Sequence, residues 1–143
     1  MKDFNEYLEK GIVKKVTSDK QRAENLMQES DSKYDFLNKM IEKMGIDDNT
    51  ANNFIEFCYN IIIYRIRAIM LEQGFSSSGF GAHEAEVAFA AKLGFSERDV
   101  RILDQLRYFR NGILYYAKKF DKEYAEKIIN FTREIIKRLK WQN

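Results

Sequence analysis

The chain of 143 residues contains no proline, a single cysteine and a single histidine. Because proline interrupts helices, its absence favours long helices joined by short loops. One cysteine cannot form an internal disulfide, and together with one histidine it cannot supply the ligands of an ordinary zinc site. The sequence has no apolar run of about 18 residues, as a membrane span needs, and no apolar signal-peptide core near its start. These absences predict a cytoplasmic protein without a membrane span, a metal site or a cofactor.

The composition is typical of a globular protein, with 45% hydrophobic and 32% charged residues. The length favours one domain that covers residues 1–143. The formal net charge is only +2, so bulk charge gives no indication of nucleic-acid binding. Any basic surface that contacts a nucleic acid must therefore be local.

Apolar residues recur at helical spacing along most of the chain, and no segment alternates convincingly with the period of a strand. The predicted helices cover 3–15, about 18–44 with Gly45 as the C-cap, a segment from Asp47 or Asp48 to about 73, 82–93, 96 to about 118, and a last segment that begins at Asp121. We therefore expect an all-α, up-and-down helical bundle of about five longer helices plus a short N-terminal one. No sheet is expected.

The segment 54–71 is apolar on nearly every side, which predicts that its helix is the central and most buried element. Cys58 lies within this run, so we expect a buried thiol rather than a nucleophile. Arg65 and Arg67 interrupt the run. They could line a ligand cleft, but burial of their stems with the charged heads reaching solvent is the favoured interpretation.

The only loop rich in glycine and serine is GFSSSGFG at 74–81, just before a predicted helix. A flexible connector is the favoured interpretation. The alternative is a cradle for a phosphate at the helix N-terminus, although no lysine follows where a phosphate-binding loop would place one. His83 comes next. A lone histidine in such a place is commonly a surface residue, but His83 is also the one side chain that titrates near neutral pH.

The segment SERDVRILDQLRYFRNGILYY at 96–116 carries the strongest functional indication. One helical face holds Ile102, Leu106, Phe109, Ile113 and Tyr116, and a second apolar stripe holds Leu103, Leu114 and Ala117. Arg110 falls within the second stripe, where a guanidinium needs a partner, a ligand or a water-filled cleft. The broad apolar arc predicts packing on two surfaces, with Arg110 at the second. The plainer alternative is that Arg107 or Arg110 pairs with a carboxylate of a neighbouring helix.

Asn111 and Gly112 are poor helix formers inside this helix, and such departures from local preference tend to mark functional sites. The run LRYFRNGILYY, preceded by GAHEAEVAF and LGFSERDV, resembles the HEPN superfamily in its small prokaryotic form over about residues 77–139. The resemblance implies a helical, often dimeric domain. Many such domains carry an arginine, then a polar residue, then a histidine after four to six residues, and in active members these side chains of two protomers cut RNA.

Other members of the superfamily bind nucleotides or act with minimal nucleotidyltransferases in toxin–antitoxin pairs. Arg110 and Asn111 match the motif, whereas the positions for the histidine hold Tyr115, Tyr116 and Ala117. The resemblance therefore implies that Arg110 and Asn111, with Arg107 nearby, hold RNA phosphate or a nucleotide. Tyr115 or Tyr116 would stack on a base or donate a hydrogen bond.

For RNA cleavage, Arg110 would stabilise developing charge and His83 would act as the base. Because the motif histidine is missing, weak or absent ribonuclease activity is expected. The implied partners are a second copy of the chain in a homodimer, RNA or a nucleotide, and a separate nucleotidyltransferase chain. Two alternatives stay open. One is a non-catalytic dimerisation or interaction module, and the other is a sensor that binds a free nucleotide without turnover.

Overall fold

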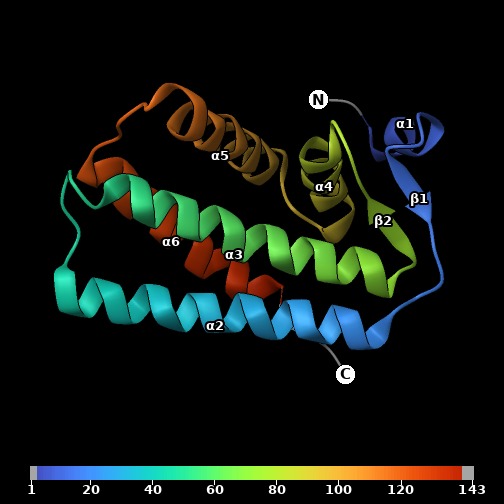
Figure 1. Ribbon diagram of the computed structural model, residues 1–143, viewed down its shortest axis with the longest axis horizontal. Helices are drawn as coiled ribbons and strands as arrows, with labels where there is room; N and C mark the ends of the chain where they lie inside the picture. Colours follow the sequence, from blue (N-terminus) through green and yellow to red (C-terminus); the bar gives the residue numbers. More distant parts are fainter. Residues whose placement is uncertain (1–2, 140–143) are drawn as a thin grey trace.

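The computed structural model describes residues 3–139, apart from the side chains of Leu114 and Tyr115. The described elements are α1 (Phe4–Glu9), β1 (Val13–Lys15), α2 (Lys20–Met44), α3 (Ala51–Glu72), β2 (Phe75–Ser77), α4 (Ala82–Ala90), the 3-10 helix η1 (Ala91–Leu93), α5 (Glu97–Tyr116) and α6 (Lys122–Arg138). The long helices α2, α3, α5 and α6 alternate in direction along the chain (Figure 1). The all-α fold with five longer helices and a short α1 is thus confirmed. None of the described helices is long and apolar enough to cross a membrane.

Helix α3 is the centre of the bundle and packs against α2, α4, α5 and α6 (Figure 1). The side chains of Ile61, Ile62 and Ile66 are completely buried. Burial of each such side chain contributes roughly 1.5–3 kcal/mol to the free energy of folding. The prediction of a buried central helix is confirmed, because a helix enclosed by four others needs apolar residues on every side.

Polar residues cap the helices close to where the sequence predicts. Ser96 and Asp99 form the reciprocal capping box of α5, and Asp121 accepts a hydrogen bond from the Tyr124 amide at the start of α6. Asp19, rather than Ser18, caps α2. The Ser18 hydroxyl instead donates to the Glu72 carbonyl oxygen at 2.7 Å, which ties the start of α2 to the end of α3. These caps satisfy backbone N–H groups that have no partner within the helix.

A two-stranded ribbon joins the N-terminal segment to the loop after α3. Strand β1 pairs antiparallel with β2, with Val13 opposite Ser77 and Lys15 opposite Phe75. The prediction of no sheet was therefore wrong, and so was the predicted helix over 3–15, which ends at Glu9. Three residues are too few to show a period of two. The strands also lie about 60 residues apart, so their pairing is a tertiary contact that local patterns cannot reveal.

The glycine-rich segment 74–81 is only partly a connector, since its residues 75–77 form β2. Gly74 has a φ of +87°, and a Cβ at this position would lie 2.9 Å from the Val16 carbonyl oxygen. Glycine is required here because the chain must turn sharply and approach the backbone of the N-terminal segment closely. The described structure thus gives this loop glycine a structural role, beside the flexible one that the sequence favours.

The broad apolar arc of α5 packs against other helices of the same chain. Leu103 of one stripe and Leu106 of the other are both completely buried, and α5 contacts α3 and α4. Among the described side chains of α5, the large hydrophobic ones that remain exposed are Tyr108 and Tyr116, at 65% and 83%. The apolar surfaces predicted for α5 therefore contact two helices of the same chain, α3 and α4.

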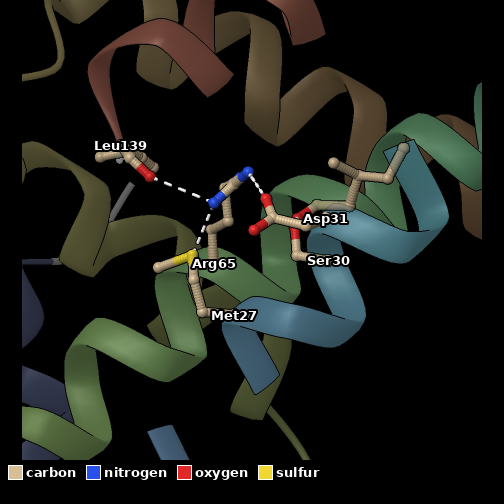
Figure 2. Close-up of polar contacts among 6 residues, drawn as sticks. Met27, Ser30, Asp31, Arg65 and Leu139 are labelled. Carbon is tan, nitrogen blue, oxygen red and sulfur yellow. Dashed lines mark hydrogen bonds and ion pairs between the residues drawn. The ribbon is translucent and has the colours of Figure 1, made fainter. Parts of the chain in front are cut away.

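Arg65 lies inside the bundle between α2, α3 and the end of α6 (Figure 2). Its guanidinium donates to Asp31, to the Met27 sulfur and, at 3.3 Å, to the Leu139 carbonyl oxygen. The residue is only 3% exposed, so the favoured prediction of a charged head in solvent is wrong for Arg65. The Asp31 carboxylate offsets part of the cost of burying this charge.

Candidate functional site

Helices α3, α4 and α5 meet around the ring of Tyr59, which is 1% exposed. The Arg110 guanidinium carbon of α5 lies 5.3 Å from the centroid of this ring. The His83 ring of α4 lies 6.3 Å from it, centroid to centroid. The structure thus brings the two predicted catalytic candidates against the same side chain. We call Tyr59, Arg67, His83, Glu86 and Arg110 the Tyr59 cluster.

Arg110 is half-buried and makes no ion pair with a carboxylate within residues 3–139. Its described partner is the face of Tyr59, a cation–π contact of about 0.5–2 kcal/mol. The plainer alternative, in which this arginine pairs with a carboxylate of a neighbouring helix, therefore does not apply to the described structure. The N–H donors of the Arg110 guanidinium are therefore available to an acceptor outside the described chain.

Arg107 differs from Arg110, because it is paired within the chain. Its Nε donates to the Asp104 carboxylate at 3.0 Å, and its Nη1 lies 3.7 Å from the Glu84 carboxylate. Glu84 also accepts a hydrogen bond of 3.3 Å from the Tyr7 hydroxyl. The carboxylate-pairing alternative therefore holds for Arg107, which is less available to an anionic ligand than Arg110.

Glu86 is a completely buried acidic residue on α4. Its carboxylate accepts two hydrogen bonds from Arg67, at 2.6 Å from Nε and 3.1 Å from Nη2. The Nδ1 atom of His83, one helical turn earlier, lies 3.3 Å from Glu86 Oε1. Burial alone would raise the pKa of the Glu86 carboxyl, but the hydrogen bonds from His83 and Arg67 outweigh it and hold this pKa below its usual range.

The hydroxyl of Tyr59 is buried and has no hydrogen-bond partner among the described residues. Burial raises the pKa of this phenol, the Glu86 charge adds to the increase, and the positive charges of Arg110, Arg107 and Arg67 oppose it. The hydroxyl therefore stays protonated near neutral pH. A buried donor without a partner costs on the order of 1–3 kcal/mol, so its presence beside charged side chains marks this junction as more than packing.

The other predicted ligand-binding residues, Asn111, Tyr115 and Tyr116, have no described contact with the Tyr59 cluster. Asn111 is half-buried, and its side chain makes no hydrogen bond within the described part of the chain. Tyr116 is 83% exposed and lies about 120° around the helix from Arg110. The side chain of Tyr115 lies outside the described residues. The structure thus places Arg110 and His83 against the Tyr59 ring, whereas Tyr116 has no described contact with that ring.

Gly112 and Cys58 give no further indication of a functional site. A Cβ at Gly112 would meet only the Lys118 side chain, at an ordinary contact distance of 3.6 Å, so described packing does not require glycine there. Cys58 is completely buried, as the sequence predicts, and burial raises the pKa of its thiol to about 12. In residues 3–139, no three His, Cys, Asp or Glu side chains converge as a metal site would require.

Sequence reasoning singled out Arg110 and His83 but missed Glu86 and Tyr59. The signal for Glu86 was its place three positions after His83, as the one polar residue of the run AEVAFAA. Tyr59 carried no such signal, because an aromatic residue in an apolar run is ordinarily core. No family model matches the chain, and no curated protein matches it either. The resemblance to HEPN domains therefore stays a prediction.

Proposed function

We propose that the chain is a HEPN-like domain that binds RNA or a nucleotide through Arg110 at the Tyr59 cluster. The observation that supports this proposal is a half-buried guanidinium that rests on an aromatic ring without a carboxylate partner in the described chain. Such a group is suited to phosphate, because its planar donors match two phosphate oxygens at once.

The balance of charge around Tyr59 also favours an anionic ligand. Glu86 is occupied by Arg67 and His83, and Arg107 is occupied by Asp104 and Glu84. Arg110 is the guanidinium near Tyr59 whose charge is left without a described counterion. A phosphate group would supply that counterion, and the side-chain amide of the next residue, Asn111, could contact a ribose or base edge.

Catalysis is a further step within the proposal. The described His83 lies on α4, outside the positions where the superfamily motif would place its histidine. We expect RNA binding with weak or absent cleavage, in which Arg110 stabilises charge and His83 is the base of any residual activity.

The test of binding compares Arg110→Met with Arg101→Met, an exposed arginine of the same helix that makes no described contact. Both variants lose one positive charge, so they have the same effect on net charge. Fluorescence anisotropy with a labelled oligouridylate measures the dissociation constant at several salt concentrations. Loss of a charged hydrogen-bonding group should weaken binding about ten- to a hundredfold for Arg110→Met. The slope of log K against log salt should also become shallower by about 0.7, as for one single-strand phosphate.

An equal, small effect of both variants would refute the role of Arg110. Absence of wild-type binding to oligouridylate and to adenosine monophosphate would refute the binding function as a whole.

A second function is a non-catalytic interaction module, and the exposed Tyr108 and Tyr116 of α5 favour it. Exposed aromatic side chains are enriched at protein interfaces. The partner would be a second copy of the chain, in a homodimer, or a separate nucleotidyltransferase chain. Light scattering at tens of micromolar protein distinguishes a homodimer from a monomer. Tyr108→Ser with Tyr116→Ser should then convert a dimer to a monomer without loss of helical content.

A further inference from the structure

The imidazole of His83 contacts the buried carboxylate of Glu86 through Nδ1, and Arg67 in turn fixes that carboxylate. Glu86 has a side chain that is 1% exposed, whereas the side chain of His83 is 51% exposed. Both Glu86 oxygens accept hydrogen bonds from Arg67, and Oε1 is also 3.3 Å from His83 Nδ1. A carboxylate with two bonds to a rigid guanidinium fork cannot rotate freely to follow the imidazole.

The second constraint on the imidazole is the ring of Tyr59, which lies 6.3 Å from it at an interplanar angle of 56°. Tyr59 is buried and cannot move aside without opening the contact between α3 and α4. The imidazole therefore has an acceptor near Nδ1 and a tilted aromatic ring beside it. Its Nε2 atom is on the other side of the ring from Nδ1, away from the buried carboxylate.

We infer that Glu86 is a positioning residue that holds His83 with its proton on Nδ1 and leaves Nε2 as the free acceptor of an imidazole that, like Arg110, lies against Tyr59. The nitrogen that carries the proton in a neutral histidine is set by the hydrogen bond that the other atoms of the site offer. A carboxylate can only accept, so Nδ1 must donate to it. Nε2 is then the atom that accepts a proton or a hydrogen bond from a ligand hydroxyl, such as a ribose 2′-OH.

This inference deepens the proposed function, because it assigns the contacting atom of the same site. It also explains why an acidic residue is buried at the centre of a site proposed for an anion. Arg67 neutralises Glu86, so the carboxylate orients the imidazole without adding a net negative charge that would repel a phosphate.

The experiment uses the whole, untagged chain labelled with 15N. His83 is the one histidine, so the imidazole signals need no assignment to a residue. Long-range 1H–15N correlation spectra at about pH 8.5, where an ordinary imidazole is neutral, distinguish a protonated ring nitrogen from a free one. The wild type should show protonated Nδ1 and free Nε2. A wild type with the proton on Nε2 overturns the inference, whatever the variants do.

Glu86→Gln is the informative variant and Glu84→Gln is its matched control on the same helix. The glutamine carbonyl should stay with Arg67 and turn the amide NH2 toward His83, which requires a free Nδ1 and moves the proton to Nε2. Glu84 contacts Tyr7 and Arg107 instead of His83, so its variant should keep the proton on Nδ1. If Glu86→Gln folds and keeps the proton on Nδ1, the positioning role is refuted.

Addition of oligouridylate separates this inference from the proposed function. Both are supported if RNA shifts the Nε2 signal of the wild type and the shift is lost in Arg110→Met. If the proton is on Nδ1 but RNA shifts no imidazole signal, the positioning role stands and the contact of Nε2 with RNA is refuted. The anisotropy titration decides the binding function separately.

Discussion

Asp31 and Arg65 should respond unequally to substitution, although they form one ion pair. The side chain of Arg65 is 4% exposed and that of Asp31 is 60% exposed. Arg65→Met keeps the apolar stem and removes the charged guanidinium. The Nε atom of this guanidinium has no hydrogen-bond partner in the described chain. The remaining Asp31 carboxylate can be hydrated. The main loss is the hydrogen bond from the charged guanidinium to the Leu139 carbonyl oxygen, about 1.5–3 kcal/mol.

The variant also no longer buries a charged guanidinium, and the desolvation free energy that it thereby avoids offsets this loss. The free energy of unfolding of Arg65→Met should therefore stay within about 1 kcal/mol of the wild-type value. Asp31→Asn has the opposite character, because it leaves the positive charge inside the bundle without its counterion (Figure 2). Removal of one partner of a fully buried pair costs about 3–5 kcal/mol. Since Asp31 is largely exposed, we expect about 1–3 kcal/mol.

Urea unfolding followed by far-UV circular dichroism at neutral pH measures the free energy of unfolding of each variant and of the double variant. The free energy of unfolding of the double variant should be close to that of Arg65→Met. Without Arg65, the change Asp31→Asn no longer leaves a buried positive charge without a counterion. A control is Lys122→Met, which removes one end of a solvent-accessible pair with Glu126 and should change stability by less than about 0.5 kcal/mol. The reasoning fails if Arg65→Met is clearly more destabilising than Asp31→Asn.

Three further outcomes are expected. Because Arg110 has no described carboxylate partner, Arg110→Met should leave the free energy of unfolding within about 1 kcal/mol of the wild type, and a large fall in melting temperature would argue for a structural role. RNA incubated with the protein and EDTA should stay largely intact, and robust cleavage that is lost in Arg110→Ala would contradict this. The folded pKa of Glu86 is lowered, so its contribution to stability is present above the unfolded value of about 4.3 and is lost as pH falls through the folded value. The stability advantage of the wild type over Glu86→Gln should therefore shrink below about pH 4, and a constant difference down to pH 2 would count against the bonded carboxylate.

Much of the fold follows from local sequence patterns. The apolar run of α3, the capping box at Ser96 and the cap at Asp121 each act within a few residues, so the sequence alone reveals them. The β1–β2 ribbon and the burial of Arg65 depend on partners far along the chain. The acceptors of Arg65 come from α2 and the end of α6, and no local pattern shows that they meet.

The candidate site could be predicted in its parts but not in its assembly. Arg110 stood out because a charge interrupted an apolar stripe, and His83 because it is the one histidine. Their common contact is Tyr59, on a third helix, and its position depends on how α3, α4 and α5 pack. Glu86 was missed because the chemistry of a buried carboxylate becomes visible only with its partner Arg67 in place.

The ribbon between β1 and β2 has a consequence for how the protein is made. On the ribosome, β1 is synthesised about 60 residues before β2, so its backbone groups have no strand partner until α2 and α3 have both been translated. When β2 arrives, Phe75 joins Phe4 and Phe89 of α4 in one cluster of rings. The segment with α1 and β1 is thus translated before β2 and α4, yet it can dock only after them, against the helix that carries His83 and Glu86.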